Sequence, residues 1–200
     1  MLDIEPGTLS RGAAHRLQTS VFVPRPIAFI GTVSPEGVTN CAPFSFANCV
    51  SSRPPVMMVA ISDRRGGVRK DTLRNILATR EFTISIVTEA IAERMHGASA
   101  SFPPEVSEFE KVRLTPRPSR KVRAPGIEES PITMELALRD AIPVAGTDVT
   151  IVLGDVLLYR IDERLLEGGM VVPERLLAVG RLGVDTYAVV REPFRLPPVE

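Results

Sequence analysis

Residues 70–72 place two side chains that could hold an anion at the expected start of a helix. Lys70 carries a full positive charge and Thr72 offers a hydroxyl donor. A helix N-terminus adds outward-pointing backbone amides, so the combination favours binding of a phosphate group. Asp71 is expected to cap the helix rather than bind the ligand. The alternative is a solvated Lys70 beside an ordinary capping Thr72.

A second polar group follows the second apolar strand. Asn48, Ser51 and Ser52 supply hydrogen-bond donors and acceptors close to Phe44 and Phe46. The proline pair that comes next forces the backbone to be extended. A polar loop that is held between strands and flanked by aromatic rings is suited to a planar ligand. The alternative is that both Phe side chains are core residues, which strand alternation favours for either one alone.

Short strands and tight turns are predicted around these residues. The turn Ser34-Pro35-Glu36-Gly37 joins two β-rich runs, and the run that begins at Lys70 has the three- and four-residue apolar spacing of a helix. In order, the sequence predicts strands over residues 26–33, 38–48, 57–62 and 81–87, with helices over 70–80 and 88–100, the latter ending near Gly97.

The second half of the chain begins with residues 101–130, which are rich in proline and charge and lack periodicity. Either a functional segment or a long surface excursion is consistent with this pattern. Residues 131–142 alternate cleanly and predict a half-buried antiparallel strand. Residues 147–162 predict another strand, with Gly154 at a bulge. A helical turn near Pro173 and a last strand over 187–190 complete the pattern.

This succession predicts a mainly β protein, an antiparallel barrel of six to eight strands with short helices, rather than a doubly wound parallel sheet. Two hundred residues with 44% apolar content are enough for one domain with a substantial core. We expect an N-terminal arm over residues 1–20 and a single domain over 21–200.

Composition excludes several classes of protein. The 24 basic and 24 acidic residues balance, and no basic block stands out, which argues against nucleic-acid binding. No apolar run approaches the roughly 20 residues of a membrane span, and no signal pattern is present, so we expect a cytoplasmic protein. The motifs for dinucleotide-binding Rossmann folds, P-loops, nucleophile elbows and zinc proteases are absent.

Two cysteines and two histidines give no metal-binding pattern. Cys41 and Cys49 would lie about 26 Å apart on one extended strand, too far for a disulfide. We interpret both as small buried hydrophobic residues. His15 and His96 are distant in sequence, so no metal is expected.

Several motifs occur together in one order. They are NCAPFSFANCVSSRPP, Lys70-Asp71-Thr72-Leu73-Arg74-Asn75-Ile76, Glu108-Phe109-Glu110, Ser130-Pro131, Gly154-Asp155-Val156, and Arg181-Leu182-Gly183 with Tyr187. Together they resemble the flavin reductase-like group of FMN-binding split-barrel proteins, which includes the flavoredoxins. The resemblance covers roughly residues 20–190. Motifs in this order are specific to the family, and much less specific to one reaction within it.

This resemblance implies a split barrel that binds FMN and forms a two-fold homodimer with each flavin near the subunit boundary. The ring would lie along residues 45–52 and the phosphate at the start of the helix. In this family residues 101–130 help to cover the flavin or contact the other subunit. The implied cofactor-binding residues are Asn40, Ser45, Phe46, Asn48, Ser51, Ser52, Lys70, Asp71 and Thr72.

Two kinds of activity are compatible with such a site. One is an NAD(P)H-dependent flavin reductase, with NADH or NADPH as a transient reductant. The other is a flavoredoxin-like electron carrier with a redox protein partner, or a plain flavin-binding module. Many relatives carry His where this chain has Arg160, a weak catalytic candidate. Arginine stays charged and cannot exchange a proton near neutral pH, though it can pair with a phosphate or carboxylate, or be a plain surface charge.

Overall fold

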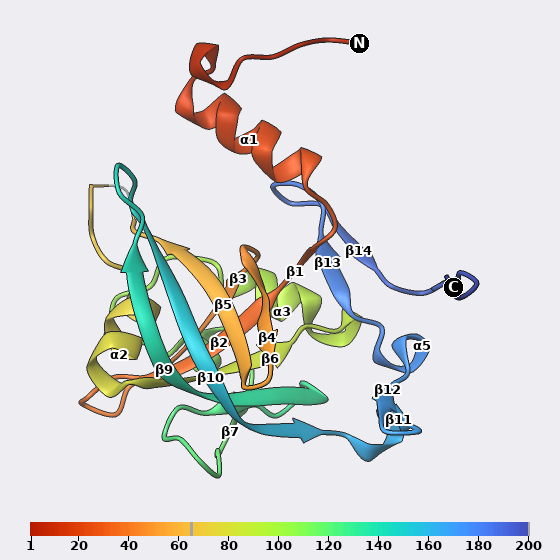
Figure 1. The fold of residues 1–200 in the computed structure, drawn as a ribbon. Helices are drawn as coiled ribbons and strands as arrows, with labels where there is room; N and C mark the ends of the chain where they lie inside the picture. Colours follow the sequence, from red (N-terminus) through yellow and green to blue (C-terminus); the bar gives the residue numbers. More distant parts are fainter. Residues whose placement is uncertain (65, 200) are drawn as a thin grey trace.

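A computed structural model of the chain describes residues 1–64 and 66–199, so Arg65 and Glu200 lie outside the described residues. Within them, the main antiparallel sheet consists of β2 (Ala28–Val33), β3 (Thr39–Phe44), β4 (Ala47–Ser52), β5 (Pro55–Ser62), β6 (Glu81–Ile86), β9 (Ile132–Pro143) and β10 (Val149–Ile161). Their order across the sheet is β3-β2-β6-β9-β10-β5-β4 (Figure 1). The predicted mainly β, antiparallel fold is confirmed.

Smaller elements surround this sheet. A second sheet contains β1 (Arg25–Pro26), β13 (Val179–Arg181) and β14 (Tyr187–Val189), and two ribbons pair β7 (Pro116–Arg117) with β8 (Gly126–Ile127) and β11 (Leu166–Glu167) with β12 (Met170–Val171). The helices are α1 (Arg11–Val21), α2 (Asp71–Thr79), α3 (Ala92–Gly97), α4 (Glu108–Lys111) and α5 (Pro173–Leu176), with 3-10 turns over Pro6–Thr8, Glu89–Ile91 and Glu163–Leu165.

The two edge strands of the main sheet, β3 and β4, are consecutive in sequence. Only Ser45 and Phe46 connect them, and three Cα steps span at most about 11 Å. Seven flat strands would separate the edges by about 29 Å, at roughly 4.8 Å per gap. The sheet must therefore curl until its edges meet. Because β3 and β4 do not pair within the described residues, the result is a barrel that is split at this connection.

The barrel interior is filled by alternate residues of the curled sheet and by one face of α2. Ala28 and Ile30 point inward, and Phe82 is 1% exposed. The core cluster comprises Ala28, Ile30, Phe44, Val59, Ile61, Leu73, Ile76, Phe82, Ile84, Met134, Leu136, Leu138 and Val152. The predicted bulge is confirmed, because the β9–β10 register shifts at Gly154. A Cβ there would lie 2.5 Å from the Phe82 ring, so only glycine fits.

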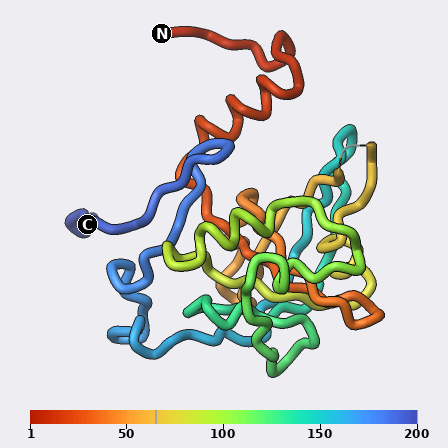
Figure 2. The backbone as a smooth tube through the Cα atoms, turned by 180° about the vertical axis from the view of Figure 1, so that it is seen from behind, coloured from red at the N-terminus to blue at the C-terminus, as the bar shows by residue number. Residues whose placement is uncertain are grey.

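A second apolar layer covers the outer face of β2 and β3. Phe29 and Cys41 point outward into it, and α3, α4 and parts of residues 101–130 lie over it (Figure 2). Its buried members are Ile27, Phe29, Cys41, Val87, Ile91, Met95, Ala98, Phe109, Leu114, Ile127 and Val179. Residues 101–130 are therefore no simple surface excursion, since several of their side chains belong to this layer.

Buried or partly buried carboxylates hold residues 101–130 in place. Glu135 accepts the backbone N–H groups of Arg120 (3.0 Å) and Lys121 (2.6 Å), and Glu81 accepts that of Arg123 (3.0 Å). Glu129 accepts the N–H of Thr115 (3.1 Å). This corrects the prediction of a half-buried strand over residues 131–142. Glu135 and its neighbour Thr133 are 0% and 1% exposed because the segment covers them.

Three further predictions are wrong in detail. Residues 47–52 are not an irregular loop but form β4, because β5 offers them backbone partners. Asp71 is not the N-cap of α2. Lys70 takes that position without a side-chain cap bond, and the Asp71 carboxylate pairs with Arg64 and Arg74. Cys49 is exposed on β4, whereas Cys41 is buried as expected.

Both ends of the chain extend from the barrel. In Figure 1, α1 projects away from the main sheet, and Thr19 is its buried residue. Residues 191–199 are exposed, including Phe194 and Leu196 at 83% and 78%. Among the described helices, none is both long and apolar enough to cross a membrane.

Glu108 is a carboxyl group enclosed between α4 and β3. It is 5% exposed, and its Oε2 atom has no hydrogen-bond partner among the described residues. Burial raises the pKa of Glu108, while hydrogen bonds from its own backbone, from Asn40 and from the Cys41 backbone oppose that rise less strongly. Folding therefore shifts this side chain toward its protonated form relative to the unfolded chain.

We expect Glu108→Gln to stabilise the protein at neutral pH relative to the parent. A carboxyl group whose pKa is raised on folding contributes its full stability below the unfolded pKa and loses it as pH rises through the folded pKa. The stability advantage of the variant should grow from pH 4 to pH 8. Urea unfolding of both proteins across this range measures it, with the exposed Glu110→Gln as control. An advantage independent of pH would contradict the assignment.

Candidate functional site

A cavity of about 160 Å³ lies beside the connection between β3 and β4. Its aromatic lining is Phe44 and Phe46, and Ser45 lies between them. Its basic lining residues are His15, Arg25, Lys70 and Arg181. None of the described residues that line it is acidic. The cavity therefore combines aromatic walls with a concentration of positive charge.

Lys70 brings an ammonium group to this cavity from the start of α2. Its Nζ atom lies 5.2 Å from the centroid of the Phe44 ring, within the range of a cation–π contact. Burial lowers the pKa of Lys70, and the charge of Arg64 lowers it further, whereas Asp63 opposes the shift. The neighbouring Asp71 pairs with Arg64 and Arg74, and among the described residues no ion pair joins it to Lys70.

Arg25 supports the opposite wall and was not predicted as a site residue. It is 2% exposed, and its guanidinium donates to the carbonyls of Thr19, Phe22 and Gly183. Its Nε atom donates to Ser45 Oγ at 3.4 Å. Burial lowers the pKa of Arg25, and nearby Arg181 lowers it further. Arg25 thus joins α1 and the β13–β14 turn to the cavity.

Sequence signals for these two arginines do exist. Arg25 is a charged residue at the start of an apolar strand, where an ion is buried only if it has partners. Arg181 opens one of the motifs that carry the family resemblance, and it lies opposite Arg25 in the β1–β13 register. A residue type that is costly to bury can therefore mark a site even where no motif contains it.

Asn40 and Thr72 are buried in a network behind the cavity. Thr72 Oγ1 and Thr32 Oγ1 donate to Asn40 Oδ1 at 3.0 and 3.1 Å, and Asn75 Nδ2 donates to Thr32 Oγ1 at 3.1 Å. These bonds hold the first turn of α2 against β2 and β3. Lys70 therefore lines the cavity, whereas Asp71, Asn40 and Thr72 do not.

Residues of β4 form a third group, on the exposed edge of the sheet. Asn48 is exposed and its Oδ1 accepts the N–H of Cys49 at 2.8 Å, while Ser51 Oγ accepts the N–H of Arg53 at 3.2 Å. Ser52 is exposed too. None of these residues lines the small cavity. Of the predicted binding residues, the cavity brings together Ser45, Phe46 and Lys70.

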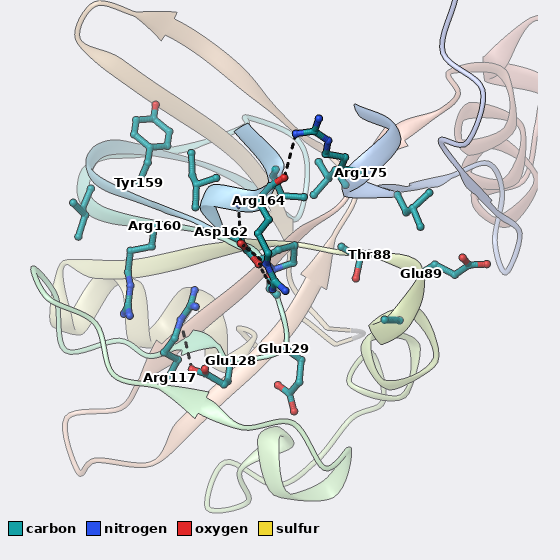
Figure 3. A pocket seen from close by; sticks show the side chains of 18 of the residues that line it. Thr88, Glu89, Arg117, Glu128, Glu129, Tyr159, Arg160, Asp162, Arg164 and Arg175 are labelled. Atoms are coloured by element: carbon teal, nitrogen blue, oxygen red, sulfur yellow. Dashed lines mark hydrogen bonds and ion pairs between the residues drawn. The ribbon is translucent and has the colours of Figure 1, made fainter. Parts of the chain in front are cut away.

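Arg160 lies in a different and larger cleft, of about 1180 Å³ (Figure 3). This cleft is bounded by the end of β10, by α5 and by residues 128–131. Arg160 Nη1 donates to the carbonyl of Pro118 at 2.6 Å and lies 3.9 Å from Glu135 Oε1. Its side chain is therefore anchored in the cleft.

The small cavity fits the anionic end of a mononucleotide, and it is too small for the whole molecule. Ligand pockets usually measure roughly 300–1000 Å³, and this one measures about 160 Å³. Its basic lining and the start of α2 suit a phosphate group.

The chain matches a described protein family and is similar to several solved structures. A family model described as "Flavin reductase like domain" matches residues 20–177. Nitrilotriacetate monooxygenase component B from Bacillus cereus is 36% identical with a TM-score of 0.94, and the match covers 98% of both chains. The 2-nitrobenzoate 2-nitroreductase NbaA from Pseudomonas fluorescens is 30% identical with a TM-score of 0.90, over 99% of this chain and 96% of that one.

Flavoredoxin of Desulfovibrio vulgaris (Miyazaki F) is 26% identical with a TM-score of 0.77, over 88% of this chain and 91% of that one. These likenesses confirm the split-barrel fold and the predicted family resemblance. Because the family model spans most of the barrel with its outer layer, the chain belongs to the flavin reductase-like domain family, a group of flavin-using oxidoreductases.

Proposed function

We propose that this protein is an NAD(P)H-dependent flavin reductase that binds FMN. The observation that carries the proposal is the small cavity at the split of the barrel, which Ser45, Phe46 and Lys70 line together. When bound, FMN supplies the N5 position that accepts a hydride from the nicotinamide. We also propose a cytoplasmic location, where NAD(P)H is available as reductant.

Lys70 and the first backbone amides of α2 hold the phosphate in this proposal. The ring lies along residues 45–52, with Phe46 as an apolar contact. Thr72 was expected to donate to the phosphate, yet its hydroxyl bonds to Asn40. We therefore assign Thr72 and Asn40 the role of holding the first turn of α2 in position.

Lys70→Ala should weaken FMN binding by about tenfold or more, because a charge-assisted hydrogen bond contributes roughly 1.5–3 kcal/mol. Riboflavin, which lacks the phosphate, should bind equally well to parent and variant. Fluorescence titration of both ligands measures the difference. Lys111→Ala, at an exposed lysine on α4, is the control. An equal loss of affinity for both flavins would place the phosphate elsewhere.

A homodimer would complete the cavity. The strand β4 is an exposed edge that carries Val50 at 56% exposure, and Leu157 and Tyr159 on β10 are 47% and 50% exposed. Open edges and apolar side chains of this kind are commonly covered by a partner, most often across a two-fold axis. We propose that each flavin lies near the boundary of the two subunits.

Sedimentation equilibrium at micromolar concentration should give about 44 kDa, twice the chain mass of 21.8 kDa. Val50→Lys on β4 should shift the equilibrium toward monomer and weaken FMN binding at the same time, because a charge would be buried without a partner. A parent protein that sediments at the mass of one chain would refute the dimer.

The flavoredoxin likeness supports a second candidate, an electron carrier that receives electrons from a protein partner. The two functions differ in their reaction with nicotinamide. We expect NADH or NADPH, mixed anaerobically with the FMN-loaded protein, to bleach the flavin absorbance rapidly. Bleaching by dithionite alone would favour the carrier. Hydride transfer itself needs no protein acid, so Arg160 in place of His leaves the reductase function possible.

A further inference from the structure

Two arginines from distant segments converge in the large cleft. Figure 3 shows Arg117, on β7, and Arg160, on β10, extending toward one another. Both stand next to Thr133, which is the β9 partner of Arg160 and accepts a hydrogen bond from Arg117 Nη2 at 2.9 Å. Their side chains are 18% and 25% exposed, so the two positive charges are only partly hydrated.

Most donors of this pair are not used by the protein. A guanidinium has five N–H donors. The hydrogen bonds of the described residues engage Nη2 of Arg117, with Thr133, and Nη1 of Arg160, with Pro118. The Nε atom of Arg117 is buried and lacks a hydrogen-bond partner among the described residues. Two like charges and an unpaired buried donor are costly unless an anion joins them.

Two nearby carboxylates lie at ion-pair distance from the arginines, but among the described residues neither accepts a hydrogen bond from a guanidinium. Glu135 Oε1 is 3.9 Å from Arg160 Nη1, and both its oxygens accept backbone N–H groups of residues 120 and 121. Glu128 Oε2 is 3.8 Å from Arg117 Nε, beyond hydrogen-bond distance, and its side chain is 56% exposed. Glu128 can therefore give way to a ligand without leaving a buried charge.

We propose that Arg117 and Arg160 form a binding site for an oxyanion, the carboxylate or phosphate of a small organic molecule. Two guanidinium groups can hold such a group through paired hydrogen bonds. Leu158, Ile161, Leu165 and Leu177 line the same cleft and can contact the apolar part of that molecule. The volume of about 1180 Å³ admits a ligand the size of an aromatic acid or a nucleotide.

This site is separate from the cavity that contains Lys70, because no residue lines both. The inference therefore does not rest on the proposed flavin site, and either could fail alone. It adds a place where a second, anionic substrate would be held. Arginine suits that task because its planar guanidinium can donate two parallel hydrogen bonds to a carboxylate or phosphate.

Calorimetric titration at low ionic strength tests the site with two probes, benzoate and adenosine 2′,5′-bisphosphate. Binding of benzoate would identify an aromatic carboxylate as the ligand, and binding of the bisphosphate a phosphate of a nucleotide. Arg160→Gln and Arg117→Gln should each lower the affinity for the probe that binds by about tenfold or more. Arg160→Lys should recover only part of the loss, because lysine lacks the planar fork.

Two further variants separate this site from general effects of charge. Glu128→Gln should raise the affinity for the probe, because it removes the carboxylate that competes for Arg117. This variant leaves both arginines in place. Arg164→Gln is the matched control. Arg164 lines the same cleft but is bound to Asp162 on its own turn, so its loss should change affinity less than twofold.

The proposal is overturned if neither probe binds the parent protein. It is equally overturned if Arg164→Gln weakens binding as much as Arg160→Gln, or if Glu128→Gln leaves affinity unchanged. Circular dichroism of each variant shows whether it is folded. If Arg117→Gln unfolds, the opposite shifts expected from Glu128→Gln and Arg160→Gln still decide the matter.

Discussion

The connection between β3 and β4 determines much of this structure. Ser45 and Phe46 join the two edge strands of a seven-stranded sheet. Because this link is so short, the sheet must curl until its edges meet. The curl encloses the apolar core, and Gly154 permits the bend on the opposite side. It also creates the split, where backbone and aromatic side chains meet at the surface beside α2.

Charged residues divide between two tasks in this protein. The carboxylates of Glu81, Glu129 and Glu135 bind backbone amides and secure the outer layer over the barrel. Arginines line both concave sites, with Lys70 in the small cavity and with Glu89, Glu128, Glu129 and Asp162 as acidic neighbours in the large cleft. A carboxylate accepts hydrogen bonds from backbone amides, whereas a guanidinium such as that of Arg25 donates to backbone carbonyls. A chain with no net charge thereby presents a locally basic small cavity.

The two sites also differ in what shapes them. The small cavity lies at the junction of α1, α2 and the β13–β14 turn, and its walls come from elements far apart in sequence. The large cleft lies where β10 extends beyond β5, so its floor is strand and its rim is residues 117–131.

The sequence by itself determined the strands of the main sheet other than β4, the bulge at Gly154 and the helix after Lys70, because turn residues and apolar periodicity are local properties. It also carried the ordered motifs that identify the family. Tertiary structure alone decided that residues 47–52 pair as β4 and that Glu135 is buried. It brought Arg25 and Arg181 to Lys70, and Arg117 to Arg160. All three features depend on contacts between residues far apart in the chain: an edge strand pairs, a distant segment covers a carboxylate, and cations converge. The periodicity of the sequence does not indicate such contacts.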